Sequence, residues 1–223
     1  MGSDDLFHKR RAKRAEQHCR EKARRAPYER ILIVCEGEKT EPNYFRWLRD
    51  RFRLNRANIV IAHKKGGLDP KSLVEYAIVE YNNDKDFDQV YCVFDKDKHT
   101  TFQGALDKIR SILSQRRIKI YAIYSIPCFE FWLLLHFEYT TRPYEAPLNN
   151  SNCELVISDL QKYIPGYKKG LQNSLLYIHD NTIDNAIIRS KQVETFHRTS
   201  GTDNPSTKVY ILVEYLKGLK IYH

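Results

Sequence analysis

Four apolar strand-like segments, each followed by a helical pattern, constrain the fold of this chain more than any other feature. They are residues 31–34, 58–62, 89–94 and 119–126. Strands that are apolar almost throughout are typical of parallel sheets covered by helices on both faces. Repeated strand–helix units also favour right-handed parallel crossovers. We therefore expect an α/β fold with a four-stranded parallel sheet flanked by helices.

The helical patterns divide the chain into a core and a C-terminal region. The core helices are expected at residues 41–52, 71–81, 102–116 and 127–137. Asp69 and Pro70 suit the N-cap and first position of the second of these helices. Beyond Tyr139 we expect helices at 153–163, 171–179, 182–196 and 208–219, with no strong strand. This pattern predicts a basic N-terminal extension (1–29), an α/β core (30–140) and a C-terminal helical extension packed on the core (141–223).

Composition excludes several classes of protein. The chain is 42% hydrophobic, which is enough for a sizeable core. No apolar run approaches the roughly 20 residues of a membrane span, and no secretory signal pattern is visible. The five cysteines form no CxxC pair. They predict structural thiols in a reduced, cytoplasmic protein rather than a zinc site.

Most of the net charge of +9 lies in one segment. Residues 9–25 carry nine Lys or Arg and two Glu, a net charge of +7, so the remainder is close to +2. Such a segment suits a nucleic-acid backbone, with Arg10, Arg11, Lys13 and Arg14 as candidate contacts. A solvated tail that only aids solubility is the alternative.

Acidic residues follow the strands of the predicted sheet. Glu36 follows the first strand, Asp95 and Asp97 end the third, and Glu130 opens the helix after the fourth. The carboxyl ends of parallel strands meet at one edge, where ligands bind in open α/β sheets. Crowded carboxylates repel one another unless a cation lies between them, and Mg²⁺ or Mn²⁺ suits such ligands. We expect Glu36, Asp95 and Asp97 to hold the metal.

Each acid also has a structural interpretation. The pair Asp95 and Asp97 is a common loop pattern, and Glu36 could simply cap the next helix. Glu41 is a first-turn acid that the helix dipole favours. Glu130 lies in a helix that is apolar nearly all round, where an unpaired carboxylate would be costly. We expect a metal, a basic side chain or backbone donors to compensate Glu130.

Basic and hydroxyl groups lie near these acids in the sequence. Lys39, Lys98 and His99 flank the acidic strand ends and could contact substrate phosphates. Ser206 or Thr207 could cap a helix, leaving its N–H groups and Lys208 as an anion site. Ordinary loop solvation and an ordinary helix start are the alternatives.

Four blocks of the sequence resemble a known family. "IVCEG" and "VFDKD" resemble the Toprim fold of topoisomerases, primases and nucleases. Together, "ILIVCEGEKTEPNYF", "VFDKDKH", "IPCFEFWLLLHF" and "NPSTKV" resemble the RloB-like family over about residues 30–219. Such proteins are encoded near bacterial restriction and abortive-infection loci, often beside an AAA-type ATPase.

The resemblance implies roles for particular residues. Glu36 matches the Toprim glutamate, which binds metal or acts as a general acid or base, and Asp95 and Asp97 match its metal-binding aspartates. Glu41 matches the second acid of related nucleases, and Glu130 lies in a block typical of the RloB-like group.

These roles imply a Mg²⁺-dependent nuclease in anti-phage defence. The expected partners are nucleic acid and an ATPase, without a membrane and with homo-oligomers left open. A binding module that keeps the fold without catalysis is the alternative.

Overall fold

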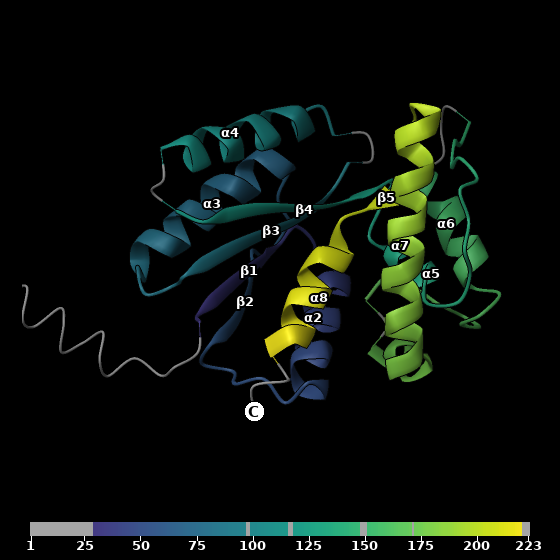
Figure 1. The fold of residues 1–223 in the computed structure, drawn as a ribbon, viewed down its shortest axis with the longest axis horizontal. Helices are drawn as coiled ribbons and strands as arrows, with labels where there is room; N and C mark the ends of the chain where they lie inside the picture. The colour runs from purple at the N-terminus through teal and green to yellow at the C-terminus, as the bar shows by residue number, and fades with distance from the viewer. Residues whose placement is uncertain (1–28, 97–98, 116–117, 148–150, 171, 220–223) are drawn as a thin grey trace, which may run out of the picture.

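The computed structural model describes residues 29–96, 99–115, 118–147, 151–170 and 172–219. Its centre is a sheet with the strand order β2-β1-β3-β4-β5 (Figure 1). The strands are β1 (Ile31–Cys35), β2 (Ile59–His63), β3 (Gln89–Asp95), β4 (Ile120–Ile126) and β5 (Ser206–Thr207). The first four are parallel, and β5 is antiparallel to β4. The predicted α/β fold is confirmed, and the arrangement is consistent with a Toprim-like sheet.

Helices cover both faces of the sheet because the residues of each strand alternate between them. The odd-numbered residues of β1 join the core beneath α2 (Thr40–Arg51) and α8 (Val209–Leu219). Its even-numbered residues join a second core beneath α3 (Pro70–Asn83) and α4 (Phe102–Ser114). Figure 1 shows the two pairs of helices on opposite sides of the strands. This double coverage explains why the strands lack polar alternation.

The remaining helices lie beyond the end of β4 (Figure 1). They are α5 (Glu130–Leu134), α6 (Asn152–Leu160), the 3₁₀ helix η1 (Gln172–Tyr177) and α7 (Asp180–Ser200). Their buried residues belong to the same apolar core as those of α2. The C-terminal segments therefore reach the edge of the sheet where the strands end. None of the described helices is long and apolar enough to span a membrane.

Two elements differ from the sequence-based expectation. The helix expected at 127–137 is regular only over α5. Its flanks form tighter turns, in which Phe131 N–H donates to the Cys128 carbonyl and Phe137 N–H to the Leu134 carbonyl. The short strand β5 was not expected, because two residues carry no strand periodicity and only pairing with β4 defines them.

The cysteines correct one prediction. Cys128, just before α5, forms a disulfide with Cys153 in α6, whereas Cys35 and Cys92 are free and buried. The expectation of structural thiols is therefore wrong for Cys128 and Cys153. The two disulfide partners are 25 residues apart, and only the packing of α6 on α5 brings them together.

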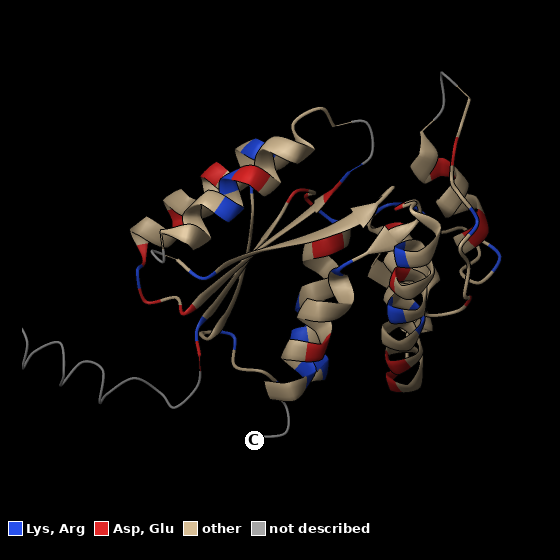
Figure 2. Cartoon of the chain, turned by 45° about the horizontal axis from the view of Figure 1, so that its top comes forward, with Lys and Arg blue, Asp and Glu red and all other residues tan. Residues whose placement is uncertain are grey.

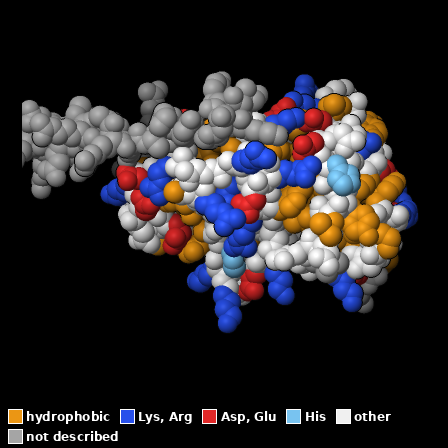
Figure 3. All heavy atoms as spheres, turned by 90° about the horizontal axis from the view of Figure 1, so that it is seen from below, with side chains coloured by type: hydrophobic (Ala, Val, Ile, Leu, Met, Phe, Trp, Pro, Cys, Tyr) orange, Lys and Arg blue, Asp and Glu red, His pale blue; other side chains and the backbone are white. Residues whose placement is uncertain are grey.

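Charged residues are concentrated on the helices and loops. Figure 2 shows Lys, Arg, Asp and Glu interspersed along these elements, while the strands are almost free of charge until they end. Figure 3 shows Lys and Arg side chains gathered on one face, in the region of α2 and α8. The last turn of α2 carries Arg49 and Arg51, of which Arg51 pairs with Asp180 at 2.7 Å.

Candidate functional site

Neighbouring parallel strands bring Glu36 and Asp95 to the same edge of the sheet. Cys35 of β1 is in register with Val93 of β3, and the Glu36 N–H donates to the Val93 carbonyl at 2.9 Å. The backbone N–H of Asp95 donates to Glu36 Oε2 at 2.8 Å. The two acids expected to meet are therefore in direct contact.

Glu41 and Glu130 complete a group of four carboxyl groups with Glu36 and Asp95, which we call the acid cluster. Glu41 lies in the first turn of α2 and is 6% exposed, while Glu130 begins α5 and is 1% exposed. Gly37 packs so tightly on Glu41 that a Cβ at this position would overlap the carboxylate. The cluster thus combines residues from four segments of the chain: the end of β1, α2, β3 and α5.

Burial and mutual repulsion raise the pKa values of three of these acids. Burial raises the pKa of Asp95 well above its usual value, and the charges of Glu41, Glu130 and Glu36 raise it further. Burial likewise raises the pKa of Glu36 from 4.5 to about 7, and the charge of Glu41 adds to this rise. The pKa of Glu41 also rises to about 7, through burial and then the charge of Glu130. Near neutral pH the cluster therefore favours an added positive charge.

One positive charge is already supplied by Lys169, which the sequence did not predict as a site residue. Its Nζ lies 3.6 Å from Glu130 Oε2. Burial lowers the pKa of Lys169, but Glu130, Asp95 and Glu41 outweigh this effect and raise it overall. Lys169 therefore remains charged and partly compensates the buried Glu130.

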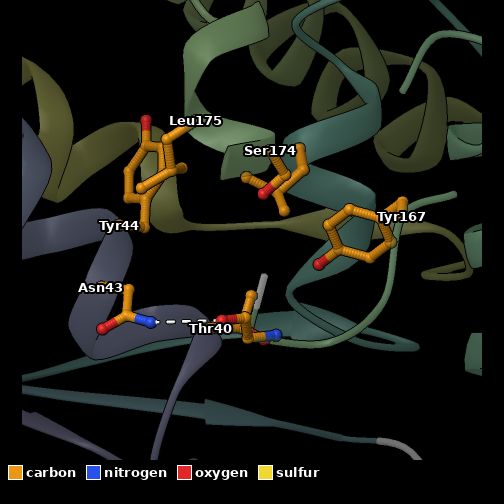
Figure 4. A pocket seen from close by; sticks show the side chains of 8 residues that line it. Thr40, Asn43, Tyr44, Tyr167, Ser174 and Leu175 are labelled. Atoms are coloured by element: carbon orange, nitrogen blue, oxygen red, sulfur yellow. Dashed lines mark hydrogen bonds between the residues drawn. The ribbon is translucent and has the colours of Figure 1, made fainter. Parts of the chain in front are cut away.

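A docked loop places Lys169 over the cluster. The Gly170 N–H donates to Thr40 Oγ1 at 2.9 Å, and Asn43 Nδ2 donates to the Gly170 carbonyl at 3.4 Å. Figure 4 shows Thr40 and Asn43 of α2 facing a small pocket that Tyr167 also lines. The Tyr167 hydroxyl donates to Glu130 Oε1 at 3.1 Å.

The sequence carries a weak sign of this loop. Gly166 and Gly170 bracket two lysines, and both glycines have positive φ angles, 71° and 79°. Glycine is the residue that adopts such angles at little cost, so a turn could have been expected here. The acids that the turn approaches lie about 40 to 130 residues earlier in the chain, so sequence spacing could not identify them.

A cavity of about 230 Å³ opens beside the cluster. It is lined by Gly37, Glu38, Lys39, Thr40, Glu41, Glu130 and Lys169. The predicted contact residue Lys39 thus lies at the cavity. Glu38 accepts a hydrogen bond from the Gly66 N–H, which ties the loop after β1 to the loop after β2.

The other predicted contact residues have different surroundings. His99 Nε2 lies 3.0 Å from Glu36 Oε1, so His99 is part of the site. Thr207 Oγ1 accepts from the Val209 N–H at the start of α8, as expected of a capping residue. Lys208 Nζ is paired with Glu194 at 2.6 Å, so its charge is already balanced.

Several predicted site residues lie outside the described residues. They are Asp97, Lys98, Arg10, Arg11, Lys13 and Arg14. Of the three predicted metal ligands, the structure therefore places Glu36 and Asp95 together and does not describe the third.

Two sets of potential metal ligands lie in this region. Within the described ranges, three potential ligands have atoms within 4.8 Å of one another. They are Cys128, Glu130 and Cys153. Its sulfurs form the disulfide, so they offer no thiolate. Glu36 and Asp95 remain the better candidates for a hard cation, since their donors are carboxylate oxygens.

Comparison with known proteins decides the family. The model of the RloB-like protein family matches residues 31–216. The chain belongs to the RloB-like family. The match covers all four acids of the cluster and Lys169, so the site lies entirely within the part that RloB-like proteins share. No curated protein and no solved structure matched this RloB-like chain.

Proposed function

We propose that this RloB-like protein is a divalent-metal-dependent nuclease that hydrolyses phosphodiester bonds of DNA or RNA. The observation that carries the proposal is the acid cluster at the carboxyl edge of a parallel sheet, with Lys169 beside it. Ligands of open α/β sheets bind at this edge. Perturbed carboxyl groups in a cavity are a physical mark of functional sites.

The residues present fit Mg²⁺ or Mn²⁺. The raised pKa values of Glu36 and Asp95 mean that their ionised forms lack sufficient positive charge nearby. Glu36 and Asp95 would hold the ion, together with Asp97, which lies outside the described residues. When bound, the ion would polarise a phosphoryl oxygen and favour ionised water as nucleophile.

The chain itself supplies charge and a proton carrier. Lys169, held by the Gly170 contacts to α2, can donate a hydrogen bond to a non-bridging phosphate oxygen and stabilise its growing negative charge. Glu41, with a pKa of about 7, can take up or release a proton near neutral pH. His99, next to Glu36, and Lys39, in the lining of the cavity beside the cluster, can orient the phosphate backbone.

The biological role that we propose is defence against phage, with an ATPase partner that controls the nuclease. This part rests on the sequence blocks shared with RloB-like proteins rather than on the geometry of the site. Loss of protection in cells by the variants described next would support it.

The direct test is cleavage of labelled DNA, RNA and tRNA with and without Mg²⁺ or Mn²⁺. We expect Asp95→Asn and Glu36→Gln to lose at least a hundredfold in rate, because each removes a charged oxygen from the cluster. Glu154→Gln, an exposed acid on α6, is the matched control and should cut like the wild type. Cleavage that persists in EDTA, or in Asp95→Asn, would contradict the proposal.

A second function has an observation of its own. Because Lys169 already compensates Glu130, the site can exist without a metal, as a binding module would require. Titration with Mg²⁺ distinguishes the nuclease from the binding module. If the site is that of a nuclease, Mg²⁺ should raise the melting temperature of the wild type but not that of Asp95→Asn. No metal-induced shift, together with tight nucleic-acid binding, would favour the binding module.

A further inference from the structure

A second cavity, of about 420 Å³, adjoins the acid cluster. Its lining includes Lys96, His99, Phe102, Gln103, Tyr124 and Ser206. It lies at the ends of β3, β4 and β5, where α4 begins. Apart from His99, the residues of its lining have no role in the mechanism proposed above, and its volume falls within the range of small-molecule sites.

The cavity combines an aromatic wall with a polar rim. The rings of Phe102 and Tyr124 are half-buried and meet edge to face, with centroids 5.3 Å apart. Gln103 is exposed at the start of α4, and Ser206 is half-buried on β5. A half-buried aromatic ring with amide and hydroxyl groups nearby suits a planar ligand that has polar edges. A nucleobase has both properties.

His99 connects the cavity to the acid cluster. Its side chain lines the cavity, while its Nε2 lies 3.0 Å from Glu36 Oε1. Lys96, which follows Asp95 directly, also lines the cavity and pairs with Asp203 at 2.5 Å. A polynucleotide with one phosphate at the cluster would therefore bring a neighbouring nucleotide to the aromatic wall.

We propose that this second cavity binds one unpaired nucleobase next to the phosphate that is cut. The inference rests on the proposed function and adds the substrate class: single-stranded nucleic acid, or a duplex with an unpaired nucleotide at the cleavage site. A base inside a duplex is stacked on both faces and cannot enter without being extruded. Base stacking on an aromatic side chain tolerates any of the bases.

Binding of labelled single strands tests the proposal. Asp95→Asn serves as the background, so that cleavage does not interfere, and both DNA and RNA oligonucleotides are used. Tyr124→Leu should weaken binding by about tenfold, and Tyr124→Phe should restore it, because stacking needs the ring and not the hydroxyl. Tyr121→Leu is the matched control, since Tyr121 is on the same strand but stacks on Tyr91. A blunt duplex should show no difference among these variants.

A measurement on the unmutated cavity guards against misfolded variants. A 5-iodouridine oligonucleotide, irradiated on the Asp95→Asn protein, should crosslink to peptides that contain Phe102 or Tyr124. Crosslinks confined to other peptides, or equal binding by Tyr124→Leu and Tyr121→Leu, would overturn the base site even if Mg²⁺-dependent cleavage occurs. Crosslinking at Tyr124 in the Asp95→Asn protein, together with no metal-dependent cleavage by the wild type, would instead support the base site and reject the nuclease.

Discussion

At the scale of single residues, two acids near the same edge behave in opposite ways. Hydrogen bonds from Ser72, including its backbone N–H, lower the pKa of Asp69 to about 2 as it caps α3. Burial raises the pKa of Glu36 to about 7 although it accepts the Asp95 N–H. Two carboxyl groups thus have a lowered pKa in one place and a raised pKa in the other, and their surroundings decide which.

The raised pKa of Glu36 predicts that stability falls as pH rises. A group whose pKa is higher in the folded state stabilises the fold fully below its unfolded value, and this contribution is lost as pH rises through the folded value. For Glu36, a shift from 4.5 to about 7 corresponds to roughly 3 kcal/mol in the free energy of unfolding, lost between these pH values. Denaturant unfolding in EDTA from pH 4.5 to 8 measures this slope.

Substitutions and Mg²⁺ should change the dependence of the free energy of unfolding on pH in defined ways. Glu36→Gln should flatten it, whereas Asp69→Asn should not change it, because the lowered pKa of Asp69 lies below this range. Mg²⁺ should stabilise the protein more at pH 8 than at pH 5, since it competes with protons for the same oxygens. A stability that rises steadily over this range and is insensitive to Glu36→Gln would contradict the argument.

Gly170 offers a second prediction at this scale. A Cβ at position 170 would lie 2.6 Å from the Lys39 Cβ, and the φ of 79° is unfavourable for any other residue. Gly170→Ala should therefore cost on the order of 2 kcal/mol and shift Lys169, with a large loss of cleavage rate. Gly166→Ala, with a similar φ of 71° but open space, should cost only about 1 kcal/mol and keep most of the activity. Melting temperatures and single-turnover rates compare the two variants.

At the scale of elements, helix packing decides which side chains meet. The short α5 carries Glu130 into the apolar core because its flanking turns are tight and its remaining residues are apolar. The loop between α6 and η1 then covers Glu130 with Tyr167 and Lys169. The compensation expected for a buried Glu130 is therefore supplied by a loop of the C-terminal region.

The disulfide between α5 and α6 gives a prediction for these elements. Closing a loop of about this length restricts the unfolded chain and stabilises the fold by about 3 kcal/mol. A reductant should lower the free energy of unfolding by a similar amount in wild type but have no effect on the Cys128→Ser/Cys153→Ser double variant. Non-reducing peptide mapping should find the two cysteines linked. Wild type that is insensitive to reductant and yields no linked peptide would refute the disulfide.

At the scale of the whole molecule, charge is divided between an extension and a body. Residues 9–25 hold +7 of the total +9, while the described body interleaves both signs (Figure 2). Figure 3 shows a local gathering of Lys and Arg near α2 and α8. Arg51, in the last turn of α2, is paired with Asp180. If the protein binds nucleic acid as proposed, we therefore expect residues 9–25 to supply most of the salt-dependent affinity.

Deleting residues 1–26 tests this attribution. Each phosphate contact contributes about 0.7 to 0.9 to the slope of log affinity against log salt concentration. The deletion should lower that slope by several units and weaken binding at low salt, while Mg²⁺-dependent cleavage of saturating substrate continues. A deletion variant with the wild-type slope would show that the extension is only a tail.

Part of the architecture could be predicted from the sequence because it depends on local patterns. Apolar strands without alternation predicted the parallel sheet, and Asp69 and Pro70 predicted the start of α3, where Asp69 accepts the Lys71 N–H. Parallel strands in sequence also predicted that Glu36 and Asp95 would meet, since their ends share one edge.

Only the tertiary structure decided what surrounds those acids. Lys169 reaches Glu130 from a loop 39 residues later in the chain, Cys153 bonds Cys128, and β5 exists only through its pairing with β4. None of these contacts has a periodicity or spacing that marks it in the sequence. They arise because buried apolar faces pack the C-terminal helices against the sheet, and the polar groups between them must then find partners.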